Sequence, residues 1–353
     1  MRNFRMKKTL LRYSLAFGCA LLCAAQAFAQ TKVYRGSIGN SHIQMRLTFE
    51  GNNVSGTYFY DTIGEDLRLT GRIDDQGRLE LSEFAAKGKQ PTGKIVCKRR
   101  LDDPIDSECT WSKPDGTRES MLDLTEQHFA FTGGLQLMPK TVSNRKTGVT
   151  VSYPQLTSSS SLSAPAQAFN RRILSLVQKA IGEFQPVDGR GAFDTNYNVL
   201  LGTNDLVSVE MTEYYDGGGA HPNNSFWALT YDLAGNKEVK FEDLFKPKSD
   251  YNAAIAKYVT DDINRRAVEL EKDNAKRENR QPNNQDEPLV SMEQLSEIAG
   301  FGLTPRGVVV YFDFPHVIAY FDKNFVPYSI VKEYLKPNGP ATSVSGLKSQ
   351  SLK

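Results

Sequence analysis

The sequence has little of what metal and thiol sites are built from: 353 residues contain only four cysteines and four histidines. The histidines (His42, His128, His221 and His316) are scattered singly, whereas a metal site needs several ligands at regular spacing, so we expect no metal site. A run of eighteen or more apolar residues is also missing, which excludes a conventional membrane-spanning helix.

The sequence also has no large excess of positive or negative charge. The formal net charge is +2, but residues 1–29 carry five basic and no acidic side chains. Without that segment, 38 basic residues stand against 41 acidic ones, a charge of about −3. This balance excludes the electrostatic footprint of a nucleic-acid-binding protein. No sequence motif indicates a cofactor.

The first 29 residues have the pattern of an export signal. A basic start over residues 1–12 precedes an apolar stretch over residues 13–25, and residues 27–29 read Ala-Phe-Ala, with small residues where a signal peptidase cleaves. Cleavage after Ala29 predicts a periplasmic or secreted protein that begins at Gln30. Lipoprotein anchoring at Cys19 is the less favoured alternative, because the usual leucine three positions before the cysteine is missing.

Two cysteines remain after cleavage, Cys97 and Cys109. They lie in adjacent strand-like runs, residues 93–100 and 107–113, and an exported protein meets an oxidising compartment. Facing positions on a hairpin bring two Cβ atoms within bridging reach, so we predict a structural disulfide that contributes about 2–3 kcal/mol.

Residues 30–130 alternate apolar and polar side chains in short runs that end at glycine and Asp/Asn turns, which predicts an all-β antiparallel meander. The meander is expected to form a small barrel or a sandwich. The eight expected strands cover residues 33–38, 43–49, 54–60, 67–73, 79–84, 93–98, 108–112 and 118–124.

Residues 140–336 mix two long helical patterns with strands, which predicts an α+β domain on an antiparallel sheet. The domain boundary is expected between residues 127 and 147, residues 271–287 as a polar loop, and residues 337–353 as a flexible tail. The expected helices cover residues 164–184, 250–276, 294–298 and 330–335, and the expected strands cover residues 197–202, 206–215, 225–232, 240–245 and parts of 301–314.

Residues 214–245 carry a family-like order of motifs. They read Tyr-Tyr-Asp-Gly-Gly-Gly-Ala-His-Pro-Asn, a strand ending in Asp-Leu, a Gly-Asn-Lys turn, and a closing Asp-Leu-Phe. This order resembles the extracytoplasmic domain family found in lysozyme-sensing anti-sigma factors and beside a peptidoglycan deacetylase (PdaC/RsiV-like). A second, shorter match covers residues 308–328, where His316 follows the proline, and Tyr320 and Lys323 stand in the places of the family's proline and glycine.

The resemblance implies an exported module associated with the cell wall, which in one branch of the family binds lysozyme. The resemblance implies no catalytic activity. In the deacetylase, catalysis is expected to reside in a separate metal-dependent domain, and no such domain is recognisable in this sequence. A lysozyme-like protein and peptidoglycan are therefore the expected partners.

The glycine-histidine loop is the one candidate site. Gly217, Gly218, Gly219 and His221 are candidate binding residues, because glycines allow close approach of the backbone to another surface. Asp216, His221 and Asp243 are candidate catalytic residues, as a carboxylate-oriented general base, if the fold brings them together. No Gly-x-Ser-x-Gly elbow accompanies them, and the same residues also suit a tight turn with a bonded imidazole.

Two hypotheses follow. The favoured one is a non-enzymatic envelope module that binds a glycan or a lysozyme-like protein. The alternative is a hydrolase that acts on an envelope polymer through the His221 loop.

Overall fold

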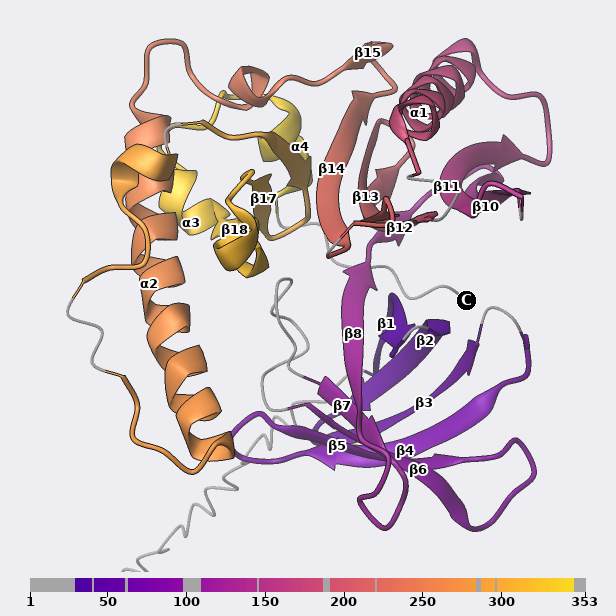
Figure 1. Cartoon of the computed structure of the whole chain (residues 1–353). Helices are drawn as coiled ribbons and strands as arrows, with labels where there is room; N and C mark the ends of the chain where they lie inside the picture. The colour runs from indigo at the N-terminus through magenta and orange to yellow at the C-terminus, as the bar shows by residue number, and fades with distance from the viewer. Residues whose placement is uncertain are drawn as a thin grey trace, which may run out of the picture.

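The computed structural model describes residues 29–39, 41–60, 63–97, 109–144, 146–186, 191–219, 221–283, 287–295 and 297–345. All of the predicted signal peptide except Ala29 lies outside the described residues. The chain forms a β-barrel followed by an α+β region (Figure 1). No helix among the described residues has the length and apolar character needed to cross a membrane.

The barrel is a closed antiparallel meander in which β1 pairs with both β2 and β8. Its strands are β1 (Gln30–Ile38), β2 (Ser41–Glu50), β3 (Asn53–Tyr60), β4 (Leu67–Ile73), β5 (Leu79–Phe84), β6 (Pro91–Cys97), β7 (Cys109–Ser112) and β8 (Ser120–Gln127). Alternate residues of each strand fill the interior, as Ile43, Met45 and Leu47 of β2 do. The predicted all-β meander is confirmed, and the barrel is the form it takes.

The predicted disulfide is confirmed. Cys97 and Cys109 occupy directly opposite positions on β6 and β7, and their sulfur atoms are bonded. Both residues are buried in the barrel core.

The α+β region is built on a seven-stranded sheet in the order β10–β11–β12–β13–β14–β15, with β9 beside β12. The strands are β9 (Phe129–Ala130), β10 (Leu135–Asn144), β11 (Val149–Ser158), β12 (Ala192–Thr203), β13 (Leu206–Asp216), β14 (Asn223–Asp232) and β15 (Lys237–Glu238). Most pairings are antiparallel, but β12 runs parallel to both β11 and β9. The prediction of an α+β region is confirmed, and the sheet is mixed rather than purely antiparallel.

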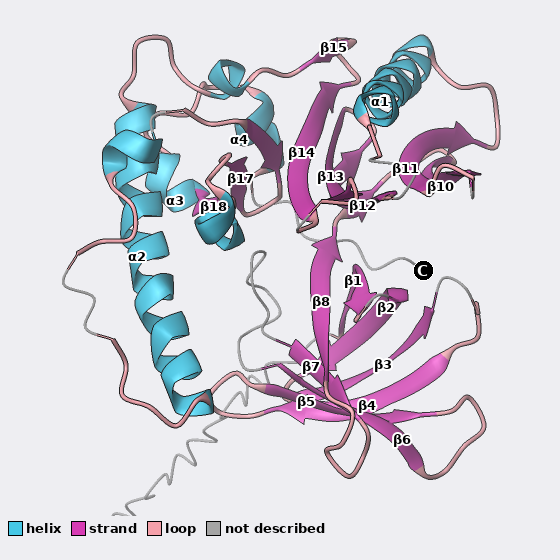
Figure 2. Ribbon diagram, in the orientation of Figure 1, coloured by secondary structure: helices cyan, strands magenta, loops and turns pink. Residues whose placement is uncertain are grey.

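Helix α1 (Ala164–Glu183) covers one face of this sheet (Figure 2). Its first turn is capped by the Ser163 hydroxyl, which accepts a hydrogen bond from the Ala166 N–H. Phe169, Ile173 and Val177, at helical spacing, are fully buried against the sheet, as the sequence pattern predicts.

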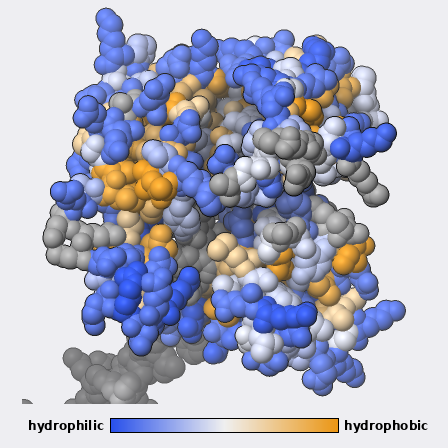
Figure 3. Space-filling model, in the orientation of Figure 1, coloured by the Kyte–Doolittle hydropathy of each residue, from blue (hydrophilic) through white to orange (hydrophobic). Residues whose placement is uncertain are grey.

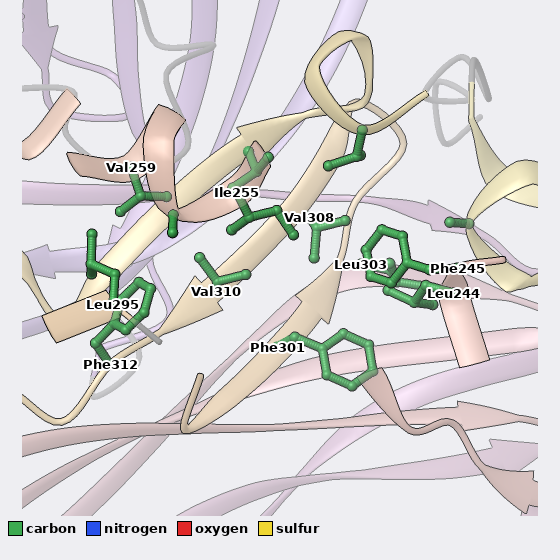
Figure 4. Packing of buried hydrophobic residues seen from close by; sticks show 14 of the residues in the cluster. Leu244, Phe245, Ile255, Val259, Leu295, Phe301, Leu303, Val308, Val310 and Phe312 are labelled. Carbon is green, nitrogen blue, oxygen red and sulfur yellow. The ribbon is translucent and has the colours of Figure 1, made fainter. Parts of the chain in front are cut away.

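A smaller antiparallel sheet of β16 (Gly300–Leu303), β17 (Gly307–Tyr311) and β18 (Lys323–Pro327) packs with the long helix α2 (Tyr251–Arg277). Figure 4 shows Ile255 and Val259 of α2 beside Val308 and Val310 of β17. The remaining elements are the 3-10 helices η1 (Phe241–Leu244), η2 (Met292–Leu295) and η3 (His316–Phe321), and the short helices α3 (Tyr328–Val331) and α4 (Pro340–Val344).

Three predictions are wrong in detail. Residues 240–245 were expected as a strand but form η1, because a capping pair between Lys240 and Asp243 closes a helical turn. The expected polar loop from residue 271 begins later, since α2 continues to Arg277. The expected flexible tail from Pro337 includes α4, whose Ala341 and Val344 side chains are buried in the core, so residues up to 345 are held in place.

The chain passes from the barrel to the large sheet without a linker. β8 ends at Gln127, and the backbone of the next residue, His128, forms hydrogen bonds with the backbones of Val199 and Gly202 in β12. The Gln127 side chain spans the junction, since its Nε2 donates to Asn198 Oδ1 (3.2 Å) and its Oε1 accepts from the Val199 N–H (2.7 Å). β9 follows at once and pairs with β12, so the second region begins near residue 128.

Candidate functional site

The glycine loop joins β13 to β14 at one end of the large sheet. The Asp216 carboxylate accepts a hydrogen bond from the Gly218 N–H (2.8 Å), which closes a turn. Gly218 has a φ of +82°, a conformation that residues with a Cβ atom adopt rarely. The glycine at this position therefore shapes the loop.

His221 contacts a second histidine from a distant part of the sequence. Its ring stacks on that of His316, the first residue of η3, with centroids 6.0 Å apart and an angle of 20° between the planes. Both histidines are exposed. The stack joins the glycine loop to η3, two segments about ninety-five positions apart in the chain.

Asp243 does not join Asp216 and His221. It lies in η1, where its carboxylate accepts a hydrogen bond from the Lys240 N–H (3.1 Å) and completes the local cap. η1 follows β15, at the opposite end of β14 from the glycine loop (Figure 1). The ten residues of β14 span about 30 Å at the rise of a β-strand. The predicted carboxylate–histidine grouping is therefore not assembled from these three residues.

Two hydrophobic side chains of η3 that follow His316 in the chain are exposed. Val317 is 89% exposed and Tyr320 is 59% exposed. Residues three apart lie on the same side of a 3-10 helix, so the two side chains face solvent together. We call His221, His316, Val317 and Tyr320 the His316 surface. The face of the molecule that Figure 3 shows is mostly hydrophilic, and its hydrophobic residues lie in separate patches.

The core holds η3 in place from below. Phe321 is 4% exposed, and its ring packs edge-on against Tyr320 (5.1 Å between centroids). Asn324 donates to the Phe321 carbonyl (2.7 Å) and accepts from the Arg266 guanidinium (2.5 Å), which also lies over the Phe321 ring. These contacts fix the C-terminal end of η3, the helix that carries the exposed side chains, in the core.

Asp322 ends η3 and is nearly buried. Its Oδ1 accepts the Phe314 N–H (2.9 Å), and the side chain lies near Asp313. Burial, helped by the Asp313 charge and opposed by the Phe314 hydrogen bond, raises the pKa of Asp322 to about 6.

A buried polar cluster between the two sheets was missed by the sequence reasoning. Glu210 of β13 is 1% exposed and accepts from Tyr311 Oη (2.5 Å), Asn198 Nδ2 (2.8 Å) and Lys323 Nζ (3.0 Å). The sequence signal was Glu210 itself, a charged residue between the apolar Val209 and Met211, which face α1 while Glu210 faces the other side of the sheet. The cluster is fully hydrogen-bonded, which is typical of a structural role.

No group of three or more potential metal ligands occurs within the described part of the chain. The four histidines lie in three separate places. His221 and His316 stack on each other, His42 is hydrogen-bonded to Asn196 of β12, and His128 is buried where the barrel meets the sheet.

Comparison with known proteins gives one family match. Residues 242–322 match DUF3298, a family of proteins of unknown function. This range includes η3 but not the glycine loop. No curated protein matches the chain.

Two solved structures are similar over the same share of the chain. A DUF3298 family protein from Pseudomonas aeruginosa PAO1 is 15% identical, with 58% of this chain and 94% of that chain covered and a TM-score of 0.36. A DUF3298 family member from Bacteroides fragilis NCTC 9343 is 13% identical, with 58% of this chain and 96% of that chain covered and the same TM-score of 0.36.

Proposed function

We propose that this protein is an exported, non-enzymatic module of the cell envelope that binds a cell-wall-related ligand, a glycan or a lysozyme-like protein, through the His316 surface. The observation that carries the proposal is the stack of His221 on His316. The stack joins the candidate binding loop to η3, the helix that carries the exposed Val317 and Tyr320 side chains.

The chemistry of the surface supports binding. Exposed aromatic and aliphatic side chains on a rigid support are typical anchors of protein interfaces, because they bury apolar area at little cost in conformational entropy. Tyrosine rings also stack on sugars, so Tyr320 suits either ligand, whereas the exposed valine beside it favours a protein.

The hydrolase hypothesis receives less support. It required Asp216, His221 and Asp243 to act together, and Asp243 lies at the far end of β14. Asp216 is engaged with the backbone of the loop rather than with the imidazole. The geometry therefore offers His221 no orienting carboxylate from this predicted set.

The test is binding of the mature protein to lysozyme by interferometry and to insoluble peptidoglycan by co-sedimentation. Val317→Asp and Tyr320→Ala should each weaken binding about tenfold, since a truncated anchor costs more than 1 kcal/mol. The matched control is Met121→Asp, which alters a 78% exposed apolar side chain on the barrel and should leave binding unchanged.

Release of soluble fragments from peptidoglycan is measured in the same samples. Equal binding by all variants would contradict the proposed surface. Fragment release that disappears in a stably folded His221→Ala protein would instead support the hydrolase.

A further inference from the structure

His128 occupies the point where the chain leaves the barrel and enters the sheet. It follows the last residue of β8 and precedes β9. Its N–H donates to the Val199 carbonyl (3.1 Å), and its carbonyl accepts from the Gly202 N–H (2.7 Å). These two hydrogen bonds to β12 place the imidazole inside the junction, where its side chain is 8% exposed.

Charged groups from three elements surround this imidazole. Glu126 of β8 has Oε1 3.7 Å from His128 Nδ1. Lys32 of β1 donates to Glu126 Oε2 (3.0 Å), and Arg306, from the turn before β17, has Nη2 3.9 Å from the same oxygen. The buried carboxylate is thus already shared by two permanent cations.

One nitrogen of the His128 imidazole lacks a hydrogen bond within the part of the chain that the structure describes. His128 Nδ1 is buried and has no hydrogen-bond partner among the described residues. A charged imidazolium would carry an N–H at Nδ1 that needs an acceptor, and the nearest carboxylate oxygen, Glu126 Oε1, lies 3.7 Å away, beyond hydrogen-bond distance. A third cation beside one buried carboxylate would also meet repulsion from Lys32 and Arg306.

We propose that the His128 junction is an acid-sensitive joint: the contact of the β8–β9 segment with β12 is closed while His128 is neutral and opens when His128 takes up a proton. Opening brings the imidazole into water, where its charged form is hydrated. The joint therefore couples the attachment between barrel and sheet to the pH of the surrounding solution.

The size of the pH effect on opening follows from the difference between the pKa of His128 in the closed and in the open junction. Burial lowers the pKa of His128 to about 4, with Arg306 and Lys32 adding to this effect and Glu126 opposing it. In an open junction the pKa returns to the ordinary value of about 6.5. Between pH 7.5 and pH 5 the open state gains about 30-fold over the closed state, because only the open state binds the proton readily.

Hydrogen–deuterium exchange measures this opening directly. The amides of His128, Val199 and Gly202 are all bonded within the junction, so their protection reports its closed state. After correction for intrinsic rates, wild-type protection in peptides covering these amides should fall about 30-fold between pH 7.5 and pH 5. Protection of the barrel strand β2 should not fall with it.

Two variants make the test specific. His128→Gln removes the titrating group and should abolish the pH dependence at the junction. His42→Gln is the matched control, because His42 also lies between barrel and β12 but is 41% exposed, and it should retain the wild-type pH dependence.

Wild-type protection that stays constant with pH would overturn the proposal, as would an equal loss in His128→Gln. If that variant fails to fold, the imidazole C2–H exchange of wild-type His128 decides the matter. An apparent pKa of 6 or above for His128 in the folded protein would then contradict the joint.

Discussion

The Lys323 ammonium lies 2.9 Å from the Glu210 carboxylate, between the large and the small sheet. Glu210 is 1% exposed and the Lys323 side chain is 12% exposed. Burial alone would raise the pKa of Glu210, but Lys323 and the hydrogen bonds from Tyr311 and Asn198 outweigh it and hold the pKa below its usual value. The ion pair thus joins β13 to β18, the strand that follows η3.

Removing only the cation of this pair should cost more stability than removing both charges. Lys323→Met leaves the Glu210 charge buried without its cation and should cost about 3–5 kcal/mol in the free energy of unfolding. Adding Glu210→Gln should recover part of that loss, because the uncompensated charge is gone. Urea denaturation of the single and double variants measures both values. A double variant no more stable than Lys323→Met would contradict the pairing.

The Cys97–Cys109 bridge predicts a second stability effect. Replacing both cysteines with serine should lower the free energy of unfolding by about 2–3 kcal/mol, because the bridge closes a short loop and limits the unfolded chain. Thermal unfolding of the wild-type and variant proteins without reductant checks this value. Two free thiols detected by mass spectrometry without reductant would show that the bridge does not form in the cell.

Gly218 and His221 separate backbone from side-chain effects in the loop. Gly218→Val forces a β-branched residue to a φ of +82° and should destabilise the loop more than His221→Ala does. His221→Ala removes only an exposed ring stack and should cost about 1 kcal/mol or less. Melting temperatures of the two variants test this order, and a larger loss for His221→Ala would contradict it.

Asp322 predicts a pH dependence opposite to that of His128. Its pKa is about 6 in the folded protein, above the ordinary value of 3.8, so the folded state binds the proton more tightly than the unfolded state. Its contribution to stability is therefore complete below pH 3.8 and is lost as the pH rises through 6.

Asp322→Asn removes this loss while the amide oxygen still accepts the Phe314 N–H. The variant should melt several degrees above the wild type at pH 8 and close to it at pH 4. Because both proteins contain His128, its effect cancels in the difference between them. A melting-temperature difference that does not change with pH would show that Asp322 carries no raised pKa.

Most of the fold is predictable where the pattern is local. The period of two in residues such as Ile43, Met45 and Leu47 specified the barrel strands, and the helical spacing of Phe169, Ile173 and Val177 specified α1. Both patterns arise because one face of each element is buried, so they are visible in a single sequence.

Elements whose identity depends on distant partners were missed. β10 is an edge strand with most side chains exposed, so it shows no clean alternation, and its strand form comes from pairing with β11. In the candidate site, a tight turn was one of the readings that the sequence left open, and the structure shows a turn closed by Asp216 and Gly218. The stack of His221 on His316 joins residues too far apart in sequence for any spacing rule to connect.

The sequence by itself determined the barrel strands, the two long helices, the pairing of the only two cysteines beyond the predicted signal, and the glycine turn. Each of these follows from periodicity, cysteine number or backbone conformation within a short stretch of chain. Tertiary structure alone decided that the meander closes as a barrel, that Asp243 lies away from His221, and that Glu210 and His128 are buried among charges. Those outcomes depend on which strand edges and faces meet, and contacts between distant residues leave no periodic trace in the sequence.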